Sequence, residues 1–212
     1  MYTDGIIFDL DGTLWDAVDE IMFTWNQVIE RYPGLRDPIQ RPEQESVMGL
    51  QMDEIAARLF PFESASRRLS LMQECVTEEN RYLREHGALL YPAVRETLSA
   101  LHAVYPLYIV SNCQQGYIEA FLHAHALESN FDGFLCYGDT GKSKGENIRA
   151  LVEAQCMTNP VYVGDTQGDQ NAAQLAGIPF VYAAYGFGSA SNYDAIIHQF
   201  KELLQIFPLN PQ

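Results

Sequence analysis

The sequence has few cysteines, few lysines and no long apolar run, and each shortage narrows the range of functions. Its four cysteines, Cys75, Cys113, Cys136 and Cys156, include no CxxC pair, which argues against a zinc knuckle and a disulfide framework. No apolar run is long enough to cross a bilayer, and no positively charged start precedes an apolar segment. We therefore expect reduced and mostly buried thiols, no membrane partner and a cytoplasmic location.

Positive charge is scarce. The 13 Lys and Arg residues are outnumbered by 28 Asp and Glu, which gives a formal net charge of −15. Phosphate contacts with nucleic acid require clustered Lys and Arg, and no basic stretch with interleaved aromatics is present, so we expect no DNA or RNA partner. A small phosphorylated substrate would need a metal ion and a few well-placed cations. The only lysines are Lys142, Lys144 and Lys201.

The second half of the chain alternates helical segments with short β-rich runs. Such alternation indicates βαβ crossovers and a mainly parallel sheet with helices on both faces. The expected strands are 107–111, 133–136, 161–164 and 180–183, and the expected helices are 93–104, 115–126, 144–156 and 168–176. A final amphipathic segment, residues 193–206, is expected to cover one face.

Residues 16–86 show no strand signal after the first motif. Apolar residues recur at helical spacing from Val18 to Ile29 and stop at Tyr32-Pro33-Gly34, and further segments of helical character follow. The predicted fold is therefore α/β: a doubly wound, mainly parallel, Rossmann-like core of residues 1–15 and 87–212, interrupted by an α-helical insert of residues 16–86.

Carboxylates follow two of the expected strands. Gly5–Phe8 is a short apolar run suited to a buried strand, and Asp9 and Asp11 come directly after it. Burying two aspartates beside a strand is unfavourable unless a cation or a shared proton compensates. An ordinary Asp-Gly turn is the alternative. Asp165 and Asp169 follow the strand 161–164, where a turn and a favourable helix N-terminal charge are the plainer explanation.

The sites of open parallel sheets lie beyond the carboxyl ends of the strands, so these residues should converge. Ser111 and Asn112 end the strand 107–111, and Ser111 Oγ with nearby backbone N–H groups can hold an anion there. The N–H groups of Gly12 and Thr13 are expected on the opposite side. A helix-capping hydroxyl is the alternative role for Ser111.

A lysine is expected at the same edge. Ser143-Lys144-Gly145-Glu146 fits an S-x-x-E capping box, which places Lys144 at the first helical position. Lys142 lies two residues earlier in a Thr-Gly loop, where a solvated surface charge is the ordinary role. We favour Lys144 and keep Lys142 as the alternative.

Taken together, these segments resemble the haloacid dehalogenase-like hydrolase superfamily. The insert is similar to the small α-helical cap of that family, and the chain is most similar to the phosphoglycolate phosphatase and β-phosphoglucomutase-like branch. The common Lys-Pro-x-Pro is replaced here by Lys-Gly-Glu-Asn, which leaves the choice of lysine open. The residues that carry the resemblance are Asp9-Leu10-Asp11-Gly12-Thr13-Leu14, Ser111-Asn112, Lys144 and Gly164-Asp165-Thr166-Gln167-Gly168-Asp169.

The resemblance implies a Mg²⁺-dependent phosphatase that hydrolyses a small phosphomonoester, similar to phosphoglycolate or a sugar phosphate. Asp9 would be the nucleophile that forms an aspartyl-phosphate, and Asp11 the general acid and base. Mg²⁺ would be held by Asp9, the Asp11 carbonyl and Asp165, with Asp169 nearby or acting through water. The phosphate-binding set would be Gly12, Thr13, Ser111, Asn112 and Lys144.

Two other functions remain open. A phosphomutase of the β-phosphoglucomutase type would need the cap to hold a bisphosphate and exclude water. A non-catalytic receiver-like module would be phosphorylated on Asp9 as a signal. Monomer and homodimer are equally open, and the cap arginines that could bind a second anionic group are Arg58, Arg67, Arg68, Arg81 and Arg84.

Overall fold

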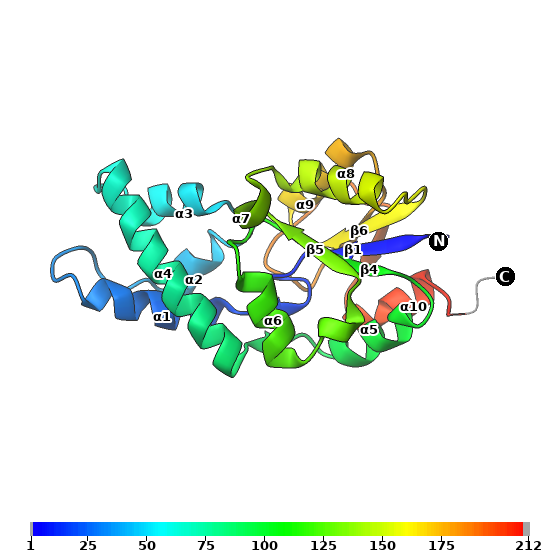
Figure 1. The fold of residues 1–212 in the computed structure, drawn as a ribbon, viewed down its shortest axis with the longest axis horizontal. Coiled ribbons are helices and arrows are strands. Elements are labelled where there is room, and N and C mark those ends of the chain that lie inside the picture. The colour runs from blue at the N-terminus through cyan, green and yellow to red at the C-terminus, as the bar shows by residue number, and fades with distance from the viewer. Residues whose placement is uncertain (1, 210–212) are drawn as a thin grey trace.

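The short apolar runs form the centre of a parallel sheet. A computed structural model of the chain describes residues 2–209. Strands β1 (Gly5–Phe8), β4 (Leu107–Ser111) and β6 (Pro160–Gly164) are buried along their whole length, as continuous apolar strands of parallel sheets are. Figure 1 shows helices on both sides of this sheet, which confirms the predicted doubly wound α/β architecture.

The strand order places β1 in the middle. Among residues 2–209 the main sheet has the order β5-β4-β1-β6-β7-β8, with every pair parallel. Phe8 pairs with Ile109 on one side and with Val163 on the other. The carboxyl ends of three strands therefore meet immediately beyond Phe8. The outer strands are β5 (Gly133–Cys136), β7 (Phe180–Ala183) and β8 (Ala195–Ile197).

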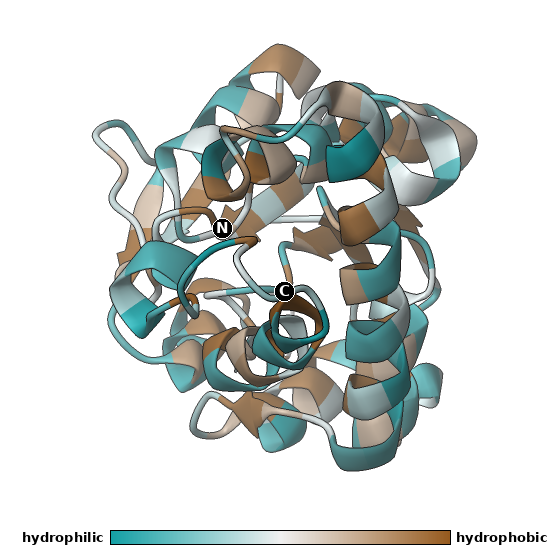
Figure 2. Ribbon diagram, turned by 90° about the vertical axis from the view of Figure 1, so that its left-hand side faces the viewer, coloured by the Kyte–Doolittle hydropathy of each residue, from teal (hydrophilic) through white to brown (hydrophobic). Residues whose placement is uncertain are grey.

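Helices from the second half of the chain cover the two faces of the sheet. In Figure 1, α8 and α9 lie above the sheet and α5, α6 and α10 lie below it. The strands are mostly coloured as hydrophobic in Figure 2, whereas each helix carries both hydrophobic and hydrophilic segments, as amphipathic helices do. Their bounds are α5 (Val94–His102), α6 (Tyr117–His125), α8 (Lys144–Ala154), α9 (Gln167–Ala176) and α10 (Leu203–Ile206).

Residues 193–206 differ from the prediction of one covering segment. Residues Ala195–Ile197 form the edge strand β8, and only the following η2 (Phe200–Glu202) and α10 cover a face. Ile197 in the strand and Phe200 in the following helical turn are both fully buried. Their apolar side chains continue one pattern across two elements, and the sequence therefore predicted a single longer segment. The short helix α7 (Tyr137–Thr140) was not predicted.

The helical insert leaves and rejoins the core at one place. Strands β2 (Trp15–Asp16) and β3 (Leu89–Leu90) pair in antiparallel fashion, and four helices lie between them in the chain. We keep the predicted division into core (1–15 and 87–212) and cap (16–86); Met1 and residues 210–212 lie outside the described part. The cap helices are α1 (Val18–Glu30), α2 (Arg41–Glu45), α3 (Met52–Leu59) and α4 (Ala65–His86).

The cap helices lie together to one side of the sheet (Figure 1). Helix α4 packs against α1 and also against α6 of the core, so it links the two parts. The apolar core is continuous between them, with Trp15, Trp25 and Tyr117 among its largest fully buried side chains. Within residues 2–209, no helix is both long and apolar enough to span a membrane.

Candidate active site

Asp9 stands at the point where three strands end. Its backbone N–H donates to Val163 O over 2.8 Å, which continues the sheet register for one residue beyond β1. The Asp9 side chain is only 2% exposed. A carboxylate so deeply buried requires compensating charge or hydrogen bonds.

Two further carboxylates lie beside it. Oxygen atoms of Asp9, Asp165 and Asp169 lie within 4.8 Å of one another, and all three residues are buried. Asp165 follows β6, and Asp169 lies in the first turn of α9. Asp169 Oδ2 accepts hydrogen bonds from the N–H groups of Asp165 (3.1 Å) and Thr166 (2.9 Å). The capping box at the N-terminus of α9 therefore fixes the orientation of the Asp169 side chain.

Lys144 is the cation of this cluster. Its Nζ lies 2.9 Å from Asp9 Oδ1 and 2.6 Å from Asp169 Oδ1, and its position follows from the predicted capping box, in which Ser143 accepts from the N–H of Glu146. Burial alone would lower the pKa of Lys144, but the neighbouring Asp169 and Asp9 carboxylates raise it. Lys142 is exposed, so the structure brings Lys144 and not Lys142 to the carboxylates.

One lysine does not balance three carboxylates. Burial, followed by the charge of Asp169, raises the pKa of Asp165 to about 7. Burial also raises the pKa of Asp9 well above its usual value. Asp169 differs: burial would raise its pKa, but Lys144 and hydrogen bonds from Thr166 lower it. The cluster therefore has an excess of buried negative charge and of oxygen atoms that can ligate a metal, which suits a hard divalent cation such as Mg²⁺.

The three aspartates differ in whether a carboxylate oxygen is free to bind a metal ion. Both Asp169 oxygens already accept hydrogen bonds, from Lys144 on one side and from Thr166 on the other. Asp165 Oδ2 accepts from the N–H groups of Phe187 (2.7 Å) and Gly188 (3.3 Å), whereas its Oδ1 faces only Thr13 Oγ1 at 3.5 Å. Asp9 and Asp165 can therefore offer an oxygen directly, and Asp169 is better placed to act indirectly.

The loop that holds Asp165 escaped the sequence analysis. Phe187 and Gly188 follow β7, in a Tyr-Gly-Phe-Gly run at the end of that strand. A Cβ on Gly186 would collide with Asp165 and with the carbonyl of Gly12. Glycines placed directly after a strand of the sheet were the available signal, because they permit close approach of backbone to the site.

Gly12 and Thr13 shape the turn after Asp11. Gly12 has φ +76°, and a Cβ there would collide with the Asp165 carboxylate. Its N–H donates to Trp15 O (3.0 Å), and the N–H of Thr13 donates to Leu10 O (3.2 Å). Neither N–H is free to bind an anion, so the structure does not support the predicted role of these two amides.

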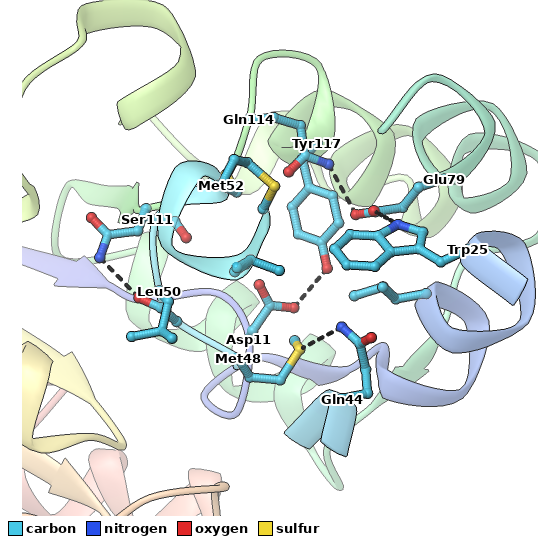
Figure 3. A pocket seen from close by; sticks show the side chains of 15 residues that line it. Asp11, Trp25, Gln44, Met48, Leu50, Met52, Glu79, Ser111, Gln114 and Tyr117 are labelled. Atoms are coloured by element: carbon cyan, nitrogen blue, oxygen red, sulfur yellow. Dashed lines mark hydrogen bonds between the residues drawn. The ribbon is translucent and has the colours of Figure 1, made fainter. Parts of the chain in front are cut away.

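Asp11 lies apart from the carboxylate cluster, beside the cap. Its Oδ1 accepts hydrogen bonds from Trp15 Nε1 (2.9 Å) and Tyr117 Oη (2.7 Å), and the bond to Tyr117 is visible in Figure 3. Burial raises the pKa of Asp11 to about 6, although both hydrogen bonds act to lower it. A carboxyl group with such a pKa can both donate and accept a proton near neutral pH.

Ser111 and Asn112 occupy the end of β4, the strand next to β1. Ser111 is 4% exposed and lines the same cavity as Asp11. The Asn112 side chain donates from Nδ2 to the carbonyl of Gly49 in the cap (2.9 Å). Ser111 is thus near the reacting groups, whereas the Asn112 amide connects the core to the cap.

Comparison with known proteins agrees with this geometry. The model of the family described as haloacid dehalogenase-like hydrolase matches residues 6–183. The chain belongs to this family. The match includes the aspartate motifs, Ser111 and Lys144, and so confirms the resemblance inferred from those segments.

Relatives of the hydrolase cover almost the whole chain. A phosphoglycolate phosphatase of Photobacterium profundum is 28% identical over an alignment of 221 positions that covers 96% of this chain and 95% of that protein. The phosphoglycolate phosphatase of Escherichia coli is 28% identical, with 94% and 90% covered. The predicted resemblance to the phosphoglycolate phosphatase-like branch is therefore confirmed.

Solved structures share the fold. A predicted phosphoglycolate phosphatase from Haemophilus somnus 129pt superposes with a TM-score of 0.86 at 22% identity, covering 96% of this chain and 97% of that one. A haloacid dehalogenase-like hydrolase from Bacteroides fragilis has a TM-score of 0.82 at 25% identity, with 95% and 100% covered. Both agree with the hydrolase fold described above.

Proposed function

We propose that the hydrolase is a Mg²⁺-dependent phosphatase that cleaves a small phosphomonoester through an aspartyl-phosphate intermediate. The observation that carries this proposal is the separation of two neighbouring carboxylates. Asp9 faces Lys144 within a cluster of negative charge, whereas Asp11 lies outside that cluster, hydrogen-bonded to Trp15 and Tyr117, with a pKa of about 6. Two carboxyl groups in different surroundings can take different catalytic roles.

In the first step an oxygen of Asp9 attacks phosphorus, and the bond from phosphorus to the alcohol oxygen breaks. Protonated Asp11 gives its proton to the departing alkoxide. In the second step Asp11, now a carboxylate, takes a proton from water, which attacks phosphorus and releases inorganic phosphate from Asp9. Lys144 offsets charge on the phosphoryl oxygens, a role that contributes about 3 kcal/mol for a well-placed donor.

Asp9, Asp165 and the backbone carbonyl of Asp11 would hold the metal ion. When bound, Mg²⁺ neutralises phosphoryl oxygens and the carboxylates around them. Asp169 would fix Lys144 rather than contribute an oxygen of its own, because both of its oxygens are engaged.

The direct test is release of inorganic phosphate from a panel of small phosphorylated metabolites, with and without Mg²⁺. Activity should require Mg²⁺ and disappear on addition of a chelator. Asp9→Asn should be inactive and folded by circular dichroism. Full activity of Asp9→Asn would exclude the mechanism.

The size of the cavity next to Asp11 favours a phosphatase over a phosphomutase. Its volume is about 30 Å³, which is room for roughly two or three water-sized groups. A sugar bisphosphate is far larger. A receiver-like module has no use for an acid and base placed like Asp11, and an aspartyl-phosphate that persists without turnover would be its signature.

A further inference from the structure

The cavity between Asp11 and the cap is a partly enclosed space. Ser111 and Tyr117 bound it on the core side, and Trp25 of α1 and Glu79 of α4 bound it on the cap side. Figure 3 shows these side chains converging around the Asp11 carboxylate. If Asp11 protonates the leaving alkoxide, this cavity receives the alcohol part of the substrate. Its volume of about 30 Å³ suits a part of a few non-hydrogen atoms.

No cationic side chain reaches this space. Among the residues that the structure describes, neither Lys, Arg nor His lines the cavity. The cap arginines are engaged elsewhere; Arg31 pairs with Glu78 at 2.7 Å and Arg41 pairs with Asp16 at 2.7 Å. The five arginines that were considered for a second anionic group, Arg58, Arg67, Arg68, Arg81 and Arg84, do not line it. A carboxylate on the substrate would therefore find no counterion here.

The cavity contains a buried carboxyl group that the phosphatase mechanism does not use. Glu79 is 1% exposed. Its Oε2 accepts a hydrogen bond from Trp25 Nε1, and its Oε1 accepts one from Gln114 Nε2 at 2.9 Å; both bonds are drawn in Figure 3. Both donors are neutral. Glu79 therefore has no positively charged partner, and burial, with the charge of Asp11, raises its pKa to about 8, so near neutral pH it binds a proton unless a cation lies beside it.

Apart from the Ser111 hydroxyl, the other polar side chains of the wall offer acceptors or donors that are already engaged. Gln44 and Gln114 are 1% and 7% exposed, and the Oε1 atom of each has no hydrogen-bond partner among residues 2–209. Two donors of the wall are already engaged: Tyr117 Oη donates to Asp11, and Gln114 Nε2 donates to Glu79 and Asn80. Buried acceptors without partners are costly. A group that brings several N–H donors into the cavity would satisfy them.

From this wall we infer that the substrate is the phosphate monoester of a small amino alcohol, whose protonated amine enters the cavity against Glu79. The ammonium group would donate to Glu79 and to the free Gln44 and Gln114 oxygens, beside the aromatic rings of Trp25 and Tyr117. A substrate carboxylate, as in phosphoglycolate, would instead face the Gln44 and Gln114 acceptors and no cation. This inference rests on the proposed phosphatase function.

Four phosphate esters of similar size separate the possibilities. They are 2-aminoethyl phosphate, 2-hydroxyethyl phosphate, propyl phosphate and 2-phosphoglycolate, each assayed with Mg²⁺ for phosphate release. We expect kcat/KM for 2-aminoethyl phosphate to exceed that for propyl phosphate by about tenfold or more, because each 1.4 kcal/mol gives a factor of ten. Phosphoglycolate should be the poorest of the four. Equal or higher kcat/KM for any of the other three would overturn the inference.

The substitution Glu79→Gln tests the counterion itself. The amide keeps the size of the side chain and removes its charge, so the ratio of kcat/KM for 2-aminoethyl phosphate to that for propyl phosphate should fall about tenfold. Glu85→Gln, on the exposed side of the same helix, should leave the ratio unchanged. An unchanged ratio in folded Glu79→Gln would also overturn the inference.

The two proposals fail in different ways. Cleavage of the four esters without preference for the amine leaves the phosphatase intact and removes the inference. Absence of phosphate release from every ester removes both. If Glu79→Gln does not fold, the ranking of the four esters by the unaltered protein decides alone.

Discussion

Asp9 and Asp11 are two residues apart, yet their carboxylates lie in different surroundings. Asp9 joins Asp165, Asp169 and Lys144, whereas Asp11 contacts Trp15 and Tyr117. The rule that sites form at the carboxyl ends of parallel strands predicted the first group. Tyr117 and Glu79 could not be predicted in the same way, because an aromatic or polar residue on a helix has the same spacing whether it packs in the core or faces a site.

The hydrogen bond from Tyr117 should be visible in the pH profile. Asp11 must be protonated to act as the acid, so kcat/KM should fall as pH rises above about 6. The Tyr117 hydroxyl stabilises the carboxylate and lowers its pKa. Tyr117→Phe should therefore move the fall to higher pH, by roughly 0.5 to 1 unit. Tyr105→Phe, whose hydroxyl contacts Pro208 O far from Asp11, serves as the control; a shift to lower pH in Tyr117→Phe would contradict this assignment.

Lys144 should matter for both activity and stability. Lys144→Met removes the cation that faces Asp9 and Asp169, and should reduce kcat by about 10² to 10³. It leaves buried carboxylates without a partner, which costs about 3–5 kcal/mol in the free energy of unfolding. Steady-state kinetics and urea denaturation measure the two effects. Lys142→Met is the matched control and should change neither; equal losses in both variants would disprove the distinction between the two lysines.

At the scale of elements, the N-termini of two helices position residues of the site. The N-terminus of α8 places Lys144, and that of α9 places Asp169. Both capping boxes are local patterns, and the one at Ser143 was evident in the sequence. The edge strand β8 was not, because three residues carry too little pattern to separate a strand from a helix. Elements with a clear cap and regular apolar spacing were thus predicted best.

A helix N-cap residue near the site should affect catalysis, and a similar N-cap residue elsewhere should not. Ser143 and Ser64 each accept a hydrogen bond from the N–H three residues on, at the starts of α8 and α4. Replacement of either by Ala should lower the free energy of unfolding by about 1 kcal/mol. Only Ser143→Ala should lower kcat, because Lys144 follows it. Equal kcat in the two variants would show that the position of Lys144 does not depend on the Ser143 N-cap.

At the scale of the whole molecule, buried acids should set the response to pH and metal. Burial raises the pKa of Asp9 and Asp11, that of Asp165 to about 7 and that of Glu79 to about 8. These groups bind more protons in the folded than in the unfolded state, so their contribution to stability is lost as pH rises from about 4 to 8. The lowered pKa values of His125 and Asp169 act in the opposite direction, and that of Asp169 acts below about pH 4, outside this range.

Thermal denaturation tests this dependence of stability on pH and metal. Without metal, Tm should be lower at pH 8 than at pH 5.5. Saturating Mg²⁺ should raise Tm at both values, and by more at pH 8, where the carboxylates that bind it are ionised. Asp165→Asn should lose most of the Mg²⁺ effect. A Mg²⁺ effect that is equal at both pH values, or larger at pH 5.5, would contradict the proposed ligands.

The position of β1 in the middle of the sheet has a consequence for biosynthesis. This strand leaves the ribosome first, but its two neighbours begin only at Leu107 and Pro160. The helices of the cap can form meanwhile, because their contacts are closer in the chain. Ile6, Ile7 and Phe8 therefore have no sheet partner until β4 has been translated, and unpaired apolar strands of this kind expose a nascent chain to aggregation.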